Sequence, residues 1–460
     1  MSRTVRRIRT TIAAAAAFSL YACGAPSAVP PPGQAFQSPT GLVGARKPKD
    51  AKIEHIIVVI QENRSVDNLF YGFPGADVQA YGYNKAGTKI PLQPIGLATT
   101  WDLGHSAAAF FTACNGTGSY PGTDCHMNGF DNEVIECGHK QFPACPNANP
   151  PYSYVPHSET APYFTLGEQY VFADQMFASN FDLSSFISHQ YIIAAQADGA
   201  FDFPNGWWGC KGGPPDTIET LTQGREPSGK RVQACFTYAT LASELDAAGI
   251  SWRDYSPNIS ANGGEWDGYQ AIKDVYYGSD WKNDVVSPNT VFFSDVSNGT
   301  LPAVSWITPT CANSDHAGCN SDTGPSWVAQ IVNAVGESQY WNSSVVFVFW
   351  DDAGGWYDHV PPTKVDYDGY GFRLPLLIIS PYAKKKFVSH TLYEHGSILK
   401  FIEDRFGLAR LSASDTRANS PENYCFDWGA PPRQFQAIPA KYSKDYILDQ
   451  PADLRPPDNN

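Results

Sequence analysis

The sequence has few basic residues and no extended basic region. Its 460 residues include 32 Lys and Arg against 46 Asp and Glu, which gives a net charge of −14. Basic residues cluster only in the first ten positions and in the run Lys384-Lys385-Lys386, so a nucleic-acid backbone is not an expected partner. The acidic balance suits solubility outside the cell and leaves room for a bound cation.

The N-terminal apolar run, residues 11–22, is too short to span a bilayer. It follows a basic segment with Arg3, Arg6, Arg7 and Arg9, a pattern typical of an export signal. The residues around Cys23 resemble a bacterial lipoprotein processing site, in which Cys23 would carry lipid. The alternatives are an ordinary signal peptide with an incidental Cys23 and, on Arg6-Arg7, twin-arginine export. We therefore predict an exported protein: periplasmic, an outer-membrane lipoprotein or secreted.

The ten cysteines include no Cys-x-x-Cys pair, which argues against a zinc site of cysteine ligands. Several of them lie close together in the sequence and would staple loops in an oxidising compartment. The sequence alone leaves the connectivity open, and Cys425 is the one we expect to be left over. The close pairs are Cys114 and Cys125, Cys137 and Cys145, Cys210 and Cys235, and Cys311 and Cys319.

Composition divides the chain into four parts. Residues 1–23 are the predicted signal peptide, and residues 24–50 form a Pro/Ala/Gly-rich linker that fits a tether. Residues 51–445 are the predicted catalytic domain, and residues 446–460 are expected to form a C-terminal tail, frayed over its last ten residues.

Three apolar segments predict buried strands: residues 53–60, 344–350 and 374–379. Helical patterns lie between or after them, at residues 240–248, 326–338 and 397–406. Apolar strands separated by amphipathic helices predict an α/β fold, with a mainly parallel central sheet flanked by helices and long disulfide-stapled loops. Ligands of such sheets bind beyond the carboxyl ends of the strands.

Two of these strands end on oxygen-bearing side chains. Glu62-Asn63 follows the first strand, and Asp351-Asp352 follows the second. Adjacent carboxylates repel each other unless a cation compensates, so the four side chains predict a site for a hard divalent cation. The alternative for the second pair is a solvated turn in which Asp351 caps a helix.

Several segments then resemble one family in order along residues 53–410. ENRSVDNLFYGFPG is similar to the opening of the bacterial phosphoesterase family, which holds phosphatidylcholine-type phospholipases C and a related acid phosphatase. Val66 stands where that family usually has Phe, and Asp352 where it has Glu. Further matching blocks are GHS, HMNGFDNE, WDDAGGWYDHVPP, GFRLPLLIISPYA and HTLYEHGSILKFIEDRFGL. The resemblance also implies a relation to the alkaline-phosphatase-like superfamily.

The resemblance implies that Glu62, Asn63, Asp351 and Asp352 bind a divalent metal ion of unknown identity. It implies Ser185 as the nucleophile, in the segment SSFISHQ, with Ser184 as the alternative. Ile187 replaces the proline that the family has there, which leaves the register open. The alternative interpretation is that this segment is a serine-rich helix N-terminus with no catalytic role.

The resemblance also assigns catalytic roles to three histidines. His105 and His316 would contact the phosphoryl group or the leaving oxygen, with His316 as the proton donor, and His359 would orient the Asp pair. We expect His395 to be structural, and His189 receives no role.

The sequence thus predicts an exported, metal-dependent hydrolase of phosphoric esters, of phospholipase C or acid phosphatase type, which acts through a phosphoserine intermediate. Its expected partner is a phosphate ester, with a phospholipid as one option, and Cys23 offers a membrane tether. The alternative function is a non-catalytic surface lipoprotein that binds a solute or calcium.

Overall fold

A computed structural model describes residues 52–117, 124–138, 144–258 and 266–455. The predicted signal peptide, Cys23 and the predicted linker lie outside these residues. Among the described residues, no helix has the length and hydropathy needed to cross a membrane.

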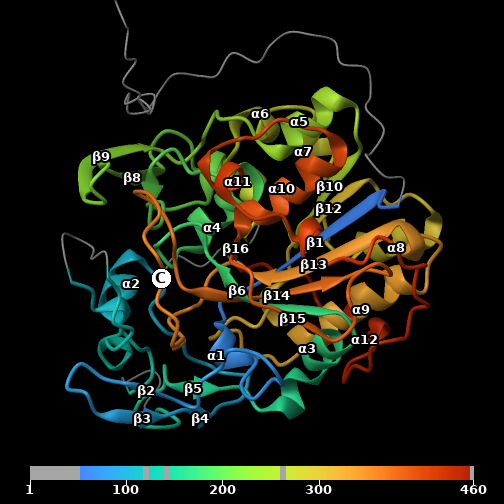
Figure 1. Ribbon diagram of the computed structural model, residues 1–460. Coiled ribbons are helices and arrows are strands. Elements are labelled where there is room, and N and C mark those ends of the chain that lie inside the picture. The colour runs from blue at the N-terminus through green and yellow to red at the C-terminus, as the bar shows by residue number, and fades with distance from the viewer. Residues whose placement is uncertain (1–51, 118–123, 139–143, 259–265, 456–460) are drawn as a thin grey trace, which may run out of the picture. The chain divides into compact units, whose positions relative to one another are not determined.

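A nine-stranded sheet forms the centre of the described chain, and Figure 1 shows it between two groups of helices. Its spatial order is β11, β10, β12, β1, β13, β14, β6 and β15, and β16 also pairs with β6. The bounds are β1 (His55–Gln61), β6 (Val171–Phe177), β10 (Trp252–Tyr255), β11 (Val285–Val286), β12 (Val304–Ile307), β13 (Ser344–Trp350), β14 (Arg373–Ile379), β15 (Phe387–Ser389) and β16 (Tyr393–Glu394).

Only β14 runs against its neighbours in this sheet. It is antiparallel to β13 and to β6, whereas the other neighbouring strands pair in parallel. The carboxyl ends of β12, β1, β13 and β6 therefore meet at one edge, where ligands of such sheets bind. The predicted mainly parallel α/β fold is confirmed.

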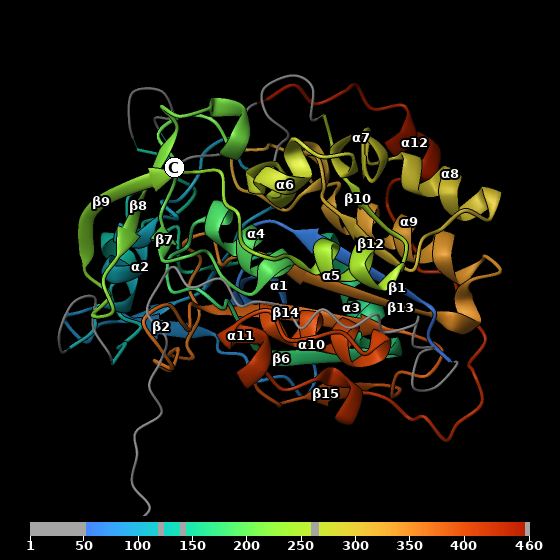
Figure 2. The same ribbon diagram turned by 90° about the horizontal axis from the view of Figure 1, so that it is seen from above.

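Helices cover both faces of the sheet, which explains why β1 and β13 are almost continuously apolar. Figure 2 looks onto one layer, α4 (Ser185–Ala194), α5 (Leu241–Ala248), α10 (His395–Phe406) and α11 (Ala413–Arg417). The opposite layer contains α3 (His157–Gln169), α8 (Val291–Asn298), α9 (Gly324–Gly336) and α12 (Lys444–Leu448). Each layer buries its apolar stripe against the strands.

Smaller elements surround this sandwich. The short helices are α1 (Val66–Leu69), α2 (Ala107–Cys114), α6 (Lys273–Tyr276) and α7 (Asp280–Asn283). The minor sheets pair β2 (Tyr81–Tyr83) with β3 (Lys89–Pro91), β4 (Gln93–Pro94) with β5 (Ser153–Tyr154), and β8 (Thr217–Leu221) with β7 (Ala200–Phe201) and β9 (Pro227–Gln233). Turns of 3₁₀ helix cover Phe130–Asn132, Gly209–Gly212, Gly268–Ala271, Cys311–Asn313, Trp341–Ser343 and Pro421–Asn423.

The four close cysteine pairs all form disulfides, which confirms the predicted loop staples. Among the described residues, Cys425 is the cysteine outside these disulfides, and it lies buried. The C-terminal segment differs from the frayed tail that its composition suggested. Gln450 accepts a hydrogen bond from Asn313 at 2.7 Å, and Asp453 accepts one from the backbone of Cys311 at 3.1 Å. The chain therefore packs against the body as far as Asp453.

Candidate active site

The two predicted ligand pairs lie side by side at one edge of the sheet. β1 and β13 are parallel neighbours, and their register places Gln61 opposite Trp350. The next residues, Glu62-Asn63 and Asp351-Asp352, therefore leave the sheet together. All four side chains are 0–1% exposed. Four oxygen-bearing groups from two separate segments thus meet in the protein interior.

The backbone at these strand ends departs from extended geometry. Asn63 has a φ of +60°, in the left-handed region that few non-glycine residues adopt. Its backbone N–H donates to Asp351 Oδ1 at 3.2 Å. Gly354 and Gly355, just past the Asp pair, also have positive φ, at +59° and +71°. These turns end the alternation of side chains along the strands, so adjacent residues can face one site.

The charges of this cluster require compensation. Burial, followed by the neighbouring Asp351, raises the pKa of Asp352 well above its usual value. Asp351 Oδ2 is buried and has no hydrogen-bond partner among the described residues. One terminal atom of the Asn63 amide lies 2.9 Å from Glu62 Oε2 and 3.2 Å from Asp351 Oδ1. As nitrogen it donates to both carboxylates; as oxygen it completes a set of hard ligands. The residues present fit a divalent cation.

Ser185 reaches the same edge from β6. It is the first residue of α4, and its Oγ donates to Asp352 Oδ2 at 3.1 Å. Ser184 is the N-cap of that helix: its Oγ accepts from the backbone N–H of Ile187 and donates to the carbonyl of Asp202 at 2.8 Å. The structure thus brings Ser185, and not the side chain of Ser184, into contact with the carboxylate cluster.

His189 belongs to this cluster, although its place in the sequence had indicated no role. Its Nε2 lies 3.0 Å from Glu62 Oε1 and 3.9 Å from Asp351 Oδ2. Burial lowers the pKa of His189 to about 4, so the ring is neutral and donates its hydrogen to Glu62. Its position in α4, one turn after Ser185, is the sequence signal that could have identified it.

His105 and His316 form a second cluster around Asp102. Asp102 Oδ2 lies 3.3 Å from His105 Nε2 and 3.7 Å from His316 Nδ1. The two imidazole rings meet edge to face, with centroids 5.2 Å apart. Trp266 stacks on His316 with ring centroids 5.4 Å apart, and the ring centroids of Phe203 and His105 are 6.2 Å apart. The structure therefore unites two predicted histidines that are far apart in the sequence.

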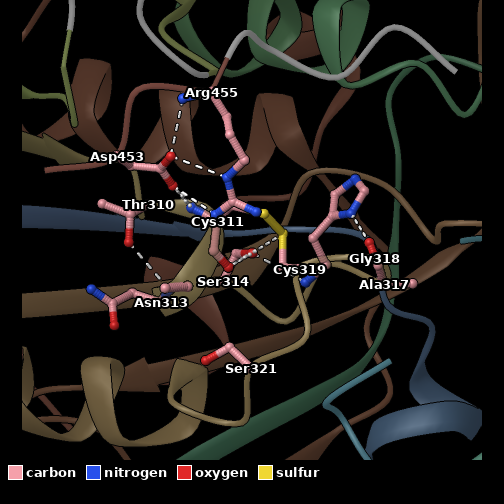
Figure 3. Close-up of a disulfide and its surroundings, with 12 residues drawn as sticks. Thr310, Cys311, Asn313, Ser314, Ala317, Gly318, Cys319, Ser321, Asp453 and Arg455 are labelled. Carbon is pink, nitrogen blue, oxygen red and sulfur yellow. Dashed lines mark hydrogen bonds and ion pairs between the residues drawn. A yellow bond between two sulfur atoms is a disulfide. The ribbon is translucent and has the colours of Figure 1, made fainter. Parts of the chain in front are cut away.

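A disulfide and hydrogen bonds hold the loop that carries His316. Figure 3 shows Cys311 bonded to Cys319, with Ser314 beside the bridge and Asp453 on the backbone of Cys311. Next to His316, the Asp315 carboxylate accepts from Trp350 Nε1 at 3.0 Å, and its carbonyl accepts from Arg64 Nε at 2.7 Å. Trp350 and Arg64 directly adjoin the ligand pairs, so this loop is fixed relative to them.

His359 lies in a different cluster. Its Nδ1 bonds to Asp67 at 2.7 Å and its Nε2 to Asp77 at 3.1 Å. The neighbouring Asp358 pairs with Arg373 at 3.0 Å. Both ring nitrogens thus have carboxylate partners other than Asp351 and Asp352, and the orienting role expected for His359 has no contact to support it.

Comparison with known proteins identifies the family of this chain. The model of the "Phosphoesterase family" matches residues 53–409. Phospholipase C B of Mycobacterium tuberculosis is 25% identical over 427 residues, which cover 83% of this chain and 78% of that protein. Non-hemolytic phospholipase C of Pseudomonas aeruginosa is 26% identical over 416 residues, which cover 79% of this chain and 55% of the relative.

Among solved structures, this chain is similar to a protein in the alkaline phosphatase superfamily from Vibrio parahaemolyticus. The TM-score is 0.37 and the identity 11%, over 82% of this chain and 73% of the other. That score is low, so the assignment depends on the family model, which spans most of the chain. The chain belongs to the phosphoesterase family and is a hydrolase that acts on phosphoric ester bonds.

Proposed function

We propose that this chain is an exported, metal-dependent phosphoesterase with Ser185 as its nucleophile. The observation that carries the proposal is the hydrogen bond from Ser185 Oγ to Asp352, within a buried cluster of oxygen-bearing side chains. A hydroxyl at the first residue of a helix also lies next to backbone N–H groups that favour a phosphate.

The residues that would hold the metal are Glu62, Asn63, Asp351 and Asp352. A divalent cation bound there would lower the pKa of the Ser185 hydroxyl and neutralise charge on the phosphoryl oxygens. The protein positions these ligands through the turns at the strand ends and through the hydrogen bond from His189 to Glu62.

The chain's own side chains supply the remaining steps. Ser185 loses its proton to solvent and its Oγ attacks phosphorus in line, which forms a phosphoserine and breaks the bond to the leaving oxygen. His316 donates a proton to that oxygen, and His105 stabilises the equatorial oxygens. Water then attacks phosphorus and gives a proton back to His316. The bond from phosphorus to Ser185 Oγ breaks, and Ser185 Oγ takes a proton from solvent as phosphate leaves.

Two substrate types fit this chemistry. The relatives are named phospholipases C, which cleave a phosphodiester, and a phosphomonoester would react through the same groups. Because both ester types would react through the same groups, the preference of the enzyme for a phosphodiester or a phosphomonoester must be measured.

The test compares Ser185→Ala with Ser184→Ala in the purified chain. We expect Ser185→Ala to lower kcat by roughly three orders of magnitude or more, on p-nitrophenyl phosphate or p-nitrophenylphosphorylcholine. Ser184→Ala removes a helix cap, costs about 1 kcal/mol of stability and leaves most of the activity. Chelation with EDTA should abolish hydrolysis, and divalent ions should restore it.

The preferred ester decides between the two substrate types. Activity that survives Ser185→Ala would overturn the nucleophile. Activity that survives complete removal of metal would overturn the metal dependence. If the metal-loaded wild type hydrolyses neither ester, the non-catalytic solute- or calcium-binding alternative is favoured.

A further inference from the structure

One carboxylate lies between the two histidines of the site. Asp102 is 5% exposed, His105 is 0% exposed and His316 is 5% exposed. Both imidazoles approach the same oxygen, Asp102 Oδ2, at 3.3 Å and 3.7 Å. The two histidines come from segments more than 200 residues apart, so Asp102 is the point at which they are joined.

The backbone fixes the orientation of the Asp102 carboxylate. Its Oδ1 accepts from the N–H of Leu103 at 2.7 Å, and its own backbone N–H donates to Glu136 at 3.0 Å. Oδ2 is therefore the oxygen that faces the imidazoles. An oxygen held in this way can set the direction of both rings.

The same contacts define which nitrogen of His316 faces the protein. His316 Nδ1 bonds to the backbone carbonyl of Ala317 and faces Asp102. A carbonyl oxygen only accepts hydrogen bonds, so Nδ1 carries the hydrogen. His316 Nε2 is then the atom that acts on a phosphate ester.

Among the charged groups around the two histidines that are named here, carboxylates outnumber cations. Asp102 faces both rings, and Asp202 interacts electrostatically with His105. The buried guanidinium of Arg64 also interacts electrostatically with Asp102, although Asp315 raises the pKa of Arg64 more strongly. One shared oxygen stabilises one added proton well, whereas two imidazolium rings 5.2 Å apart repel each other.

We propose that Asp102 is a positioning residue that couples His105 and His316 into a pair sharing one extra proton. This inference rests on the proposed function of the site. In the first step, Ser185 loses its proton to solvent, and the bond from phosphorus to Ser185 Oγ forms as the bond to the leaving oxygen breaks. The shared proton leaves His316 Nε2 for that oxygen, and the pair becomes neutral. In the second step, water attacks phosphorus and gives one proton to the pair, the bond from phosphorus to Ser185 Oγ breaks, and Oγ takes a proton from solvent.

The test compares Asp102→Asn with Glu136→Gln and Asp102→Glu. Glu136→Gln is the matched control, because it removes a carboxylate that bonds to the backbone of Asp102 and keeps an acceptor there. Two substrates, p-nitrophenyl phosphate and glycerol 1-phosphate, separate proton donation from positioning. The p-nitrophenolate leaving group needs no proton, whereas the glycerol alkoxide does.

We expect Asp102→Asn to lower kcat on glycerol 1-phosphate by roughly 10²- to 10⁴-fold and kcat on p-nitrophenyl phosphate far less. Its pH profile on glycerol 1-phosphate should lose activity at lower pH than the wild type, because the proton is held less tightly. Asp102→Glu should restore part of the activity, and Glu136→Gln should resemble the wild type. Metal content per chain should be the same in all variants.

An equal loss on both esters with an unchanged pH profile would show a merely structural role and overturn the proposal. Loss of one of two bound metal ions in Asp102→Asn would show a second metal site instead. ¹⁵N-histidine NMR titration of the metal-loaded protein gives a readout that needs no turnover. Unchanged titration of both rings in Asp102→Asn would overturn the coupling, even if the wild type hydrolyses neither ester and the proposed function fails.

Discussion

Neighbouring side chains along a β-strand point to opposite faces, so Glu62 and Asn63 need a change of backbone direction to act together. The left-handed conformation of Asn63 provides it, and Asn tolerates this conformation better than most residues. A residue-scale feature thus decides whether two adjacent ligands converge.

At the same scale, His189 holds Glu62 in place. We predict that His189→Ala weakens metal binding by about 10- to 100-fold, because the donor to Glu62 Oε1 is lost. Isothermal titration with Mn²⁺ or Zn²⁺ measures the change, and His189→Gln should recover part of it. The control is His157→Ala, because His157 is an exposed histidine on α3. Equal affinity of wild type and His189→Ala would contradict the prediction.

At the scale of elements, the turn after β13 must pass close to the end of β1. A Cβ on Gly354 would lie 2.5 Å from the carbonyl oxygen of Asn63 and 2.6 Å from its Cβ. Non-bonded Cβ atoms essentially never come this close to another atom, so a side chain at this position would displace Asn63, a ligand of the proposed metal.

We therefore predict that Gly354→Ala loses most of its metal affinity and hydrolytic activity. Gly72→Ala is the matched control: its φ is +75°, and a Cβ there would have no atom within 4 Å. Both variants carry about 1–2 kcal/mol of left-handed strain, so their thermal stabilities should both fall. Only Gly354→Ala should lose metal in titration calorimetry. Comparable metal affinity in the two variants would show that the turn does not position Asn63.

At the scale of the whole molecule, a buried charge cluster joins segments distant in the sequence. Arg373 at the start of β14 pairs with Asp358 and contacts Asp67 of α1 at 3.5 Å. His359 adds bonds to Asp67 and Asp77. Burial lowers the pKa of His359, but the hydrogen bond and charge of Asp67 outweigh burial, so its pKa is raised above 6.5.

The sign of this shift fixes a pH dependence of stability. A histidine whose pKa is raised by folding stabilises the folded state fully below about pH 6.5, and this contribution disappears as the pH rises through the folded pKa. The thermal midpoint of His359→Gln should therefore lie further below that of the wild type at acidic pH than at alkaline pH. Thermal unfolding of both proteins, with His157→Gln as control, measures the difference. A gap that widens with rising pH would contradict the assignment.

The sheet edge that carries the candidate site was predictable because its signals are local. Apolar runs that end on Glu62-Asn63 and Asp351-Asp352 are visible in the sequence, and the second strand has the predicted bounds, Ser344–Trp350. The direction of β14 was not predictable, because the residue pattern of an apolar strand does not indicate whether the strand is parallel or antiparallel to its neighbours. Asp102 and His189 were also missed: each works through a partner far along the chain, Asp102 with His316 and His189 with Glu62.

By itself the sequence determined the α/β class, the family, the disulfide-rich loops and the residue types of the site, since composition, periodicity and motif order depend on neighbours along the chain. Only the tertiary structure decided which of these residues meet. It joined His105 to His316 through Asp102, brought Ser185 to Asp352, and placed His359 with Asp67 and Asp77. The physical reason is that strand order and direction, which bring distant segments to one edge of the sheet, are set by packing of the whole chain.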